Sequence, residues 1–114
     1  MAAGALVRQH RGMLELRPIC ENCAAPLPPA ATNAMICSFE CTFCRDCAVD
    51  VLGDVCPNCG GGFTARPIRP QTNWRDDTYL GTFPAVVERR HLPVDVVAHA
   101  ALAARIGSLA PHER

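Results

Sequence analysis

The chain has 114 residues with eleven basic and eleven acidic side chains, so its formal net charge is zero, and a chain of this length builds one small core with appendages. Although 49% of the residues are hydrophobic, many of them are alanine or cysteine, and the remaining large apolar side chains are too few for a core without metal ions or disulfides. The charge gives no indication of a general affinity for nucleic acid, and no apolar run approaches the roughly 20 residues that a transmembrane helix requires.

Residues 1–12 show no periodicity and few apolar side chains, and we expect a disordered tail there. Arg8, His10, Arg11 and Gly12 interrupt any apolar stretch of signal-peptide length. Secretion is therefore not indicated, and the expected location is the reducing cytoplasm, where thiols persist.

Residues 13–63 are expected to form a Cys-rich domain, because eight cysteines fall there in four close pairs, three with the spacing Cys-x2-Cys and one with Cys-x3-Cys. A tight turn between such cysteines directs both sulfurs at one ion, and two turns complete a closed tetrahedron. We therefore expect two structural zinc ions without catalytic activity, with disulfides as the alternative. The expected metal ligands are Cys20, Cys23, Cys37, Cys41, Cys44, Cys47, Cys56 and Cys59.

Residues 64–92 are expected to be an extended linker with an aromatic segment. Pro67 and Pro70 each fix their own φ and restrict the residue before them. Docking of the aromatic segment onto the zinc unit is the expected arrangement, and docking onto a partner is the alternative. The side chains concerned are Trp74, Tyr79, Leu80 and Phe83.

Residues 93–107 are expected to form a C-terminal α-helix, with Pro93 at its first position, Asp95 in its first turn and Gly107 at its end. One narrow apolar stripe follows the helical period, and it packs either within the chain or against a second copy. Its members are Val94, Val97, Ala98, Ala101, Leu102 and Ile106.

The four histidines lie outside the cysteine pairs, and we expect them to be solvated. Asp95 and His99 are one helical turn apart, but catalysis would need a third group and a pocket. The protein is therefore expected not to be an enzyme.

The cysteine spacing resembles that of a RING finger, with Phe43 just before the fifth ligand and Pro57 inside the last pair. The stretch from Met13 to Pro70 also resembles a small bacterial family of Cys-rich proteins classed as domain of unknown function 1272. The RING resemblance implies a small metal-stabilised α+β fold of RING-like or treble-clef type. It also implies a cross-brace, in which the first and third pairs share one ion and the second and fourth pairs share the other.

A sequential pairing, in which the first two pairs share one ion and the last two pairs share the other, is the alternative to the cross-brace. Because Cys41 and Cys44 are only three residues apart, the two sites must be neighbours in either case. Interleaved pairs tie the long first loop into one unit, whereas sequential pairs leave two subdomains with almost no core. We therefore expect the cross-brace.

The expected function is that of a structural zinc module acting as a protein-protein interaction or regulatory adaptor, with an unidentified protein partner and a possible homo-oligomer through the C-terminal helix. A ligase-like adaptor is the first alternative, but ligase RINGs place an apolar residue where this chain has Glu21 and Asn22, and a basic residue where it has Gly60. A nucleic-acid-binding zinc finger is the second, with Arg66, Arg69 and Arg75 as contacts. Two filled thiolate sites would bring the chain to about −4, which disfavours this second alternative.

Overall fold

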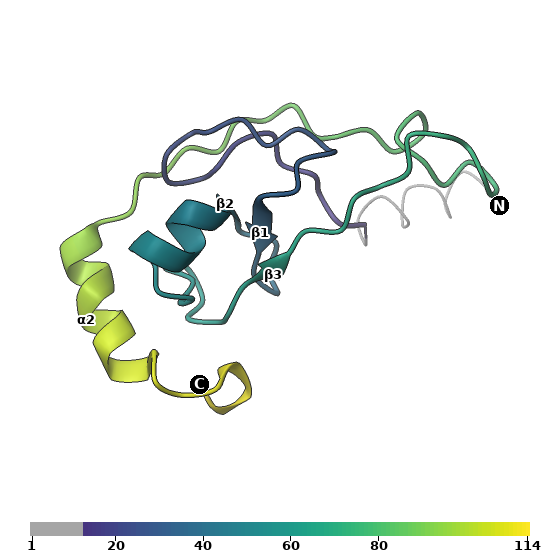
Figure 1. Ribbon diagram of the computed structural model, residues 1–114. Helices are drawn as coiled ribbons and strands as arrows, with labels where there is room; N and C mark the ends of the chain where they lie inside the picture. The colour runs from purple at the N-terminus through teal and green to yellow at the C-terminus, as the bar shows by residue number, and fades with distance from the viewer. Residues whose placement is uncertain (1–12) are drawn as a thin grey trace, which may run out of the picture.

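A small antiparallel sheet forms part of the computed structural model, which describes residues 13–114 (Figure 1). Strand β1 (Ala34–Ile36) lies between β2 (Thr42–Cys44) and β3 (Thr64–Ala65). Met35 of β1 is paired with Phe43 on one side and with Ala65 on the other. The tail expected at residues 1–12 lies outside the described residues.

The β1–β2 hairpin separates the two middle cysteine pairs. Its loop is closed by the N–H of Cys37, which donates to the carbonyl of Cys41 at 3.2 Å, and Glu40 adopts a left-handed φ of 68°. Cys41 precedes β2 and Cys44 ends it, so an extended strand places their backbones about 10 Å apart. The hairpin therefore delivers Cys41 and Cys44 to opposite ends of one strand.

A short helix, η1 (Cys47–Val51), follows β2 and has π-helical geometry. The N–H of Leu52 donates to the carbonyl of Cys47 at 2.8 Å, five residues earlier in the chain. Ala48 and Leu52 are buried, whereas Val49 is exposed. The turn thus holds Cys47 against the core.

The core is thin, as the composition predicts, and it combines a few large apolar side chains with the cysteines. Phe43 is fully buried, and its ring meets that of Phe63 edge-on at 5.4 Å. The other large apolar side chains with almost no exposure are Leu16, Leu27, Leu52 and Val55.

Helix α2 (Val96–Ile106) begins three residues later than predicted. Asp95 is its N-cap with extended backbone, and the Asp95 carboxylate accepts from two backbone N–H groups of the first turn, each at 3.1 Å. Pro93 precedes the cap, because Asp95 satisfies the free N–H groups that define a helix start. The helix ends at Gly107, as predicted, and a short 3-10 helix, η2 (Pro111–Glu113), follows it.

The face that α2 turns to the rest of the protein differs from the predicted stripe. His99 is buried, and its ring Nε2 lies 2.9 Å from the carbonyl of Leu52. Val97, a member of the predicted stripe, is 80% exposed, and that part of the prediction is wrong. The buried and half-buried positions of α2 are His99, Leu102, Ala103 and Ile106.

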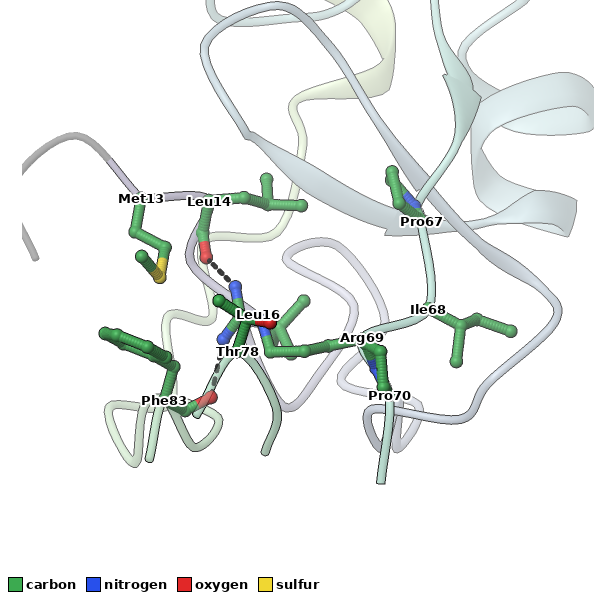
Figure 2. A pocket seen from close by; sticks show the side chains of 9 residues that line it. All are labelled: Met13, Leu14, Leu16, Pro67, Ile68, Arg69, Pro70, Thr78 and Phe83. Atoms are coloured by element: carbon green, nitrogen blue, oxygen red, sulfur yellow. Dashed lines mark hydrogen bonds between the residues drawn. The ribbon is translucent and has the colours of Figure 1, made fainter. Parts of the chain in front are cut away.

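The segment expected as a linker contains β3 and two arginines that bind backbone carbonyls. Arg66 is buried and donates to the carbonyls of residues 17, 27 and 28 at 2.8–3.1 Å. Arg69 donates to the carbonyls of Leu14 and Phe83 at 2.7 and 2.6 Å, as Figure 2 shows. Trp74, in contrast, is 76% exposed, so the aromatic segment docks at Phe83 and not at its tryptophan.

Residues 86–94 run alongside residues 16–21 and parallel to them. The N–H of Val86 donates to the carbonyl of Leu16 at 3.2 Å, and the N–H of Leu92 donates to the carbonyl of Glu21 at 2.8 Å. Figure 1 shows this green segment passing the purple start of the described chain before it enters α2. Among residues 13–114, no helix has the length and apolar character needed to cross a membrane.

Candidate metal centre

The first and last cysteine pairs form turns of the same kind. In each, the residue after the second cysteine is left-handed, Ala24 with φ 64° and Gly60 with φ 80°, and its N–H donates to the carbonyl of the first cysteine, at 2.9 and 2.8 Å. Such a turn directs two sulfurs to the same side of the backbone. The middle residues are also alike, because the sequences are Cys-Glu-Asn-Cys and Cys-Pro-Asn-Cys.

The first cluster consists of Cys20, Cys23, Cys44 and Cys47, whose four sulfurs all lie within 4.8 Å of one another. The sulfurs of Cys23 and Cys44 are 3.8 Å apart, close to the roughly 3.7 Å edge of a tetrahedron of sulfurs around zinc. Three of the cysteines are buried and Cys23 is exposed.

The second cluster consists of Cys37, Cys56 and Cys59, whose three sulfurs also lie within 4.8 Å of one another. Cys41 stands beside this group, since the neighbouring Cys37 and Cys56 both act on the pKa of its thiol. The structure therefore brings Cys41 to the second cluster without placing its sulfur as tightly as the other three.

The clusters interleave along the chain, and this confirms the cross-brace of the predicted fold class. Cys20 lies with Cys44 and not with Cys37, so the sequential pairing is wrong. The physical reason is the β1–β2 hairpin, which separates Cys41 from Cys44 by the length of one strand.

The chemistry of the clusters fits a metal ion. All eight cysteines are free thiols, and sulfurs that converge in a group of four and a group of three without forming disulfides suit soft or borderline ions such as zinc. Each cluster could hold one ion, and the first offers a protein ligand at every position of a tetrahedron.

Burial controls the protonation of most of these thiols. It raises the pKa of Cys41, Cys44, Cys47 and Cys56. Burial acts in the same direction on Cys20, but the backbone N–H groups of Cys23, Cys44 and Asn22 donate to its sulfur and hold its pKa below the ordinary 9.0. Metal binding needs thiolates, so loading must displace protons from most of the cluster.

Two asparagines support the clusters, and the sequence analysis did not identify them in this role. Asn22 donates its side-chain amide to the sulfur of Cys47 at 3.3 Å, and the Asn58 side chain lies beside Cys41, where it opposes the effect of burial on the pKa of that thiol. Groups that hydrogen-bond metal ligands orient them and tune the site. The repeated Cys-x-Asn-Cys was the signal that could have revealed both residues.

The histidines were expected to be solvated, and His99 shows that this prediction is wrong for one of them. Its side chain is buried, with 6% exposure, and Nε2 must donate to the carbonyl of Leu52, because a carbonyl only accepts. The Asp95 carboxylate caps the start of α2. Each side chain therefore bonds to the backbone.

A cavity of about 300 Å³ lies away from both clusters, between the N-terminal stretch and the chain after β3. Figure 2 shows that its lining is mostly apolar, with Met13, Leu14, Ile68 and Phe83 around the stem of Arg69. The Arg69 guanidinium is occupied by two carbonyls. The cavity therefore presents no set of reactive side chains.

Comparisons with known proteins cover the cysteine clusters. No solved structure matches the chain. An uncharacterized protein of Rhizobium meliloti (strain 1021) is 60% identical over 58 residues, which cover 51% of this chain and 69% of the relative. The model of a family described as "Protein of unknown function (DUF1272)" matches residues 13–69, which include all eight cysteines. The chain belongs to the DUF1272 family.

Proposed function

We propose that this protein is a structural, non-catalytic zinc-binding module that holds two zinc ions per chain and presents its surface to a protein partner as an interaction or regulatory adaptor. The observation that carries the proposal is the interleaved pair of all-thiol clusters in a unit whose core is otherwise thin. Free cysteines at this density favour a reducing compartment, and a cytoplasmic location is part of the proposal.

Zinc is the proposed ion because it takes four thiolates in a closed tetrahedron and needs no other ligand. A closed site supports a fold and does not activate water or substrate. The absence of enzyme activity in the proposal follows from this chemistry and from Asp95 and His99, which serve the helix and its docking.

A protein partner is proposed because apolar side chains remain exposed on α2. Val96 is 56% exposed and Val97 is 80% exposed, and Ala100, Ala101 and Ala104 share that side of the helix. A second copy of the chain is one partner of suitable chemistry. Light scattering of the zinc-loaded protein over a range of concentrations distinguishes self-association from a heterologous partner.

The two alternative functions have less support. A ligase RING uses the position between its first two ligands to contact its partner. Here Glu21 occupies that position. Its side chain is 3% exposed, and its carbonyl accepts from the Leu92 N–H. For nucleic acid, Arg66 is buried and Arg69 is engaged with carbonyls. Of the three arginines considered, Arg75 is the exposed one.

Elemental analysis of protein purified without added metal tests the proposal. The expected result is two zinc ions per chain, with a tetrahedral thiolate spectrum after replacement by cobalt(II). A ratio near one, or iron in place of zinc, contradicts the proposal. Discharge of a charged ubiquitin-conjugating enzyme by the protein would favour the ligase alternative instead.

A further inference from the structure

Asn22 lies between two ligands of the first cluster and bonds in two directions. Its side-chain Nδ2 donates to the sulfur of Cys47 at 3.3 Å. Its side-chain Oδ1 accepts from the backbone N–H of Val94 at 2.9 Å. One amide therefore joins the first cluster to the segment that precedes α2.

These two partners determine the orientation of the Asn22 amide. The Val94 N–H can only donate, so it requires the amide oxygen, and the metal-bound thiolate of Cys47 would accept, so it requires the amide nitrogen. A flipped amide would lose both hydrogen bonds. A single orientation of the Asn22 amide therefore serves both contacts.

The backbone beside Asn22 holds the same segment. The carbonyl of Asn22 accepts from the His91 ring Nε2 at 3.1 Å, and the carbonyl of Glu21 accepts from the Leu92 N–H at 2.8 Å. These carbonyls belong to the turn between Cys20 and Cys23, whose shape depends on both sulfurs binding one ion.

We propose that Asn22 is a positioning residue that couples the first metal site to the C-terminal segment, so that residues 91–106 dock fully only against a loaded site. The inference rests on the proposed metal binding and extends it. A bound ion would hold the sulfurs of Cys20, Cys23 and Cys47 together, and so fix both the turn that carries Asn22 and the sulfur that its amide contacts, while the same amide holds Val94. Coupling of this kind is reciprocal, and docking of the segment in turn stabilises the loaded site.

Asn58 provides the matched control. It occupies the same place in the last cysteine pair and its side chain lies beside Cys41 of the second cluster, but its amide donates to the Glu21 carboxylate at 2.9 Å and not to the backbone before α2. Asn58→Ala therefore removes the equivalent support from the second site while it leaves the Val94 contact in place.

The experiment measures amide hydrogen exchange in the full-length protein with both sites loaded, as verified by elemental analysis before exchange. In Asn22→Ala we expect the amides of α2 to exchange about tenfold faster, the effect of one lost hydrogen bond to the segment, while those of β1 and β2 keep their protection. In Asn58→Ala the amides of α2 should exchange nearly as in the parent. Equal exchange of α2 in the parent and in Asn22→Ala, or equal acceleration in both variants, would overturn the proposal.

Replacement of zinc by ¹¹³Cd allows the NMR resonance of each metal site to be measured, and simple loosening of the helix would not change these resonances. Each site yields its own resonance, and Asn22→Ala should shift the first-site resonance alone, whereas Asn58→Ala should shift only that of the second. Asn22→Asp keeps an oxygen for Val94 but places a negative oxygen against Cys47, so it should shift the first-site resonance and, because the coupling runs through the Cys47 contact, it should also speed the exchange of the α2 amides. If Asn22→Ala cannot be loaded, Asn22→Asp decides, and an unmoved first-site resonance in that variant contradicts the coupling. Failure of the parent to bind two ions would instead refute the proposed function.

Discussion

Arg66 brings a positive charge into the interior and binds only neutral groups there among the described residues. It is 3% exposed, its guanidinium donates to the carbonyls of Arg17, Leu27 and Pro28, and burial lowers its pKa. It remains charged at neutral pH. Arg66 thus links the start of the Cys-rich domain and its proline-rich first loop to the chain directly after β3.

Arg66→Ala should lower the free energy of unfolding of the zinc-loaded protein by about 3 kcal/mol, because it leaves buried carbonyls without donors. Arg66→Lys should recover only part of this loss, since an ammonium group does not reproduce the planar fork of donors. Denaturant unfolding measures both. Arg75→Ala is the control, and because that residue is exposed its effect should stay within about 0.5 kcal/mol. Equal stability of Arg66→Ala and the parent would show that the three hydrogen bonds do not matter.

At the scale of the element, α2 shows how a polar residue can select the buried face of a helix. The apolar period predicts that Val97 faces inward, but His99 takes the central buried position through its bond to the Leu52 carbonyl. Ile106, the last residue of α2, contacts the protein near Gly60. The helix is rotated so that one hydrogen bond is satisfied while valines are left in solvent.

This orientation predicts opposite results for two apolar positions of α2. Val97→Glu should change the free energy of unfolding by less than about 0.5 kcal/mol, because the side chain is 80% exposed. Ile106→Ala should cost about 1–2 kcal/mol, the low end for a large aliphatic side chain that is half-buried. Thermal unfolding of both variants measures the difference. A larger loss in Val97→Glu than in Ile106→Ala would mean that the apolar period predicted the buried face correctly.

At the scale of the whole molecule, the interleaved clusters lead us to expect that the fold depends on both proposed ions. Binding of a structural zinc contributes about 10 kcal/mol or more, while the entire stability of a small domain is about 5–15 kcal/mol. Removal of metal by a chelator should therefore abolish the cooperative unfolding transition, as followed by circular dichroism. A chelated protein that keeps a cooperative transition would show that the apolar core suffices.

The cross-brace makes a sharp prediction for two cysteines only three residues apart. Cys44→Ser should perturb the same ¹¹³Cd resonance as Cys20→Ser, and Cys41→Ser the same resonance as Cys56→Ser. The reason is that β2 carries Cys41 and Cys44 to different sites. A common effect of Cys41→Ser and Cys20→Ser would restore the sequential pairing.

Acidification should release the metal. Burial raises the pKa of four of the thiols above their ordinary 9.0, so without metal they hold protons at neutral pH, whereas the loaded state holds none. Protons therefore favour the metal-free state, and the apparent affinity should rise with pH across the neutral range. Competition with a chromophoric chelator at several pH values measures this, and an affinity independent of pH would contradict it.

The sequence by itself determined the four close cysteine pairs, the closeness of the two sites and the presence of a C-terminal helix capped by Gly107. These follow from local chemistry, because the spacing within each pair fixes a turn and the short interval from Cys41 to Cys44 brings the two sites together. The interleaved pairing was expected, and the tertiary structure decided it through the strand between Cys41 and Cys44. Only the tertiary structure decided the roles of Asn22, Arg66 and His99. Each of them bonds to groups more than twenty residues away, and neither periodicity nor spacing contains that information.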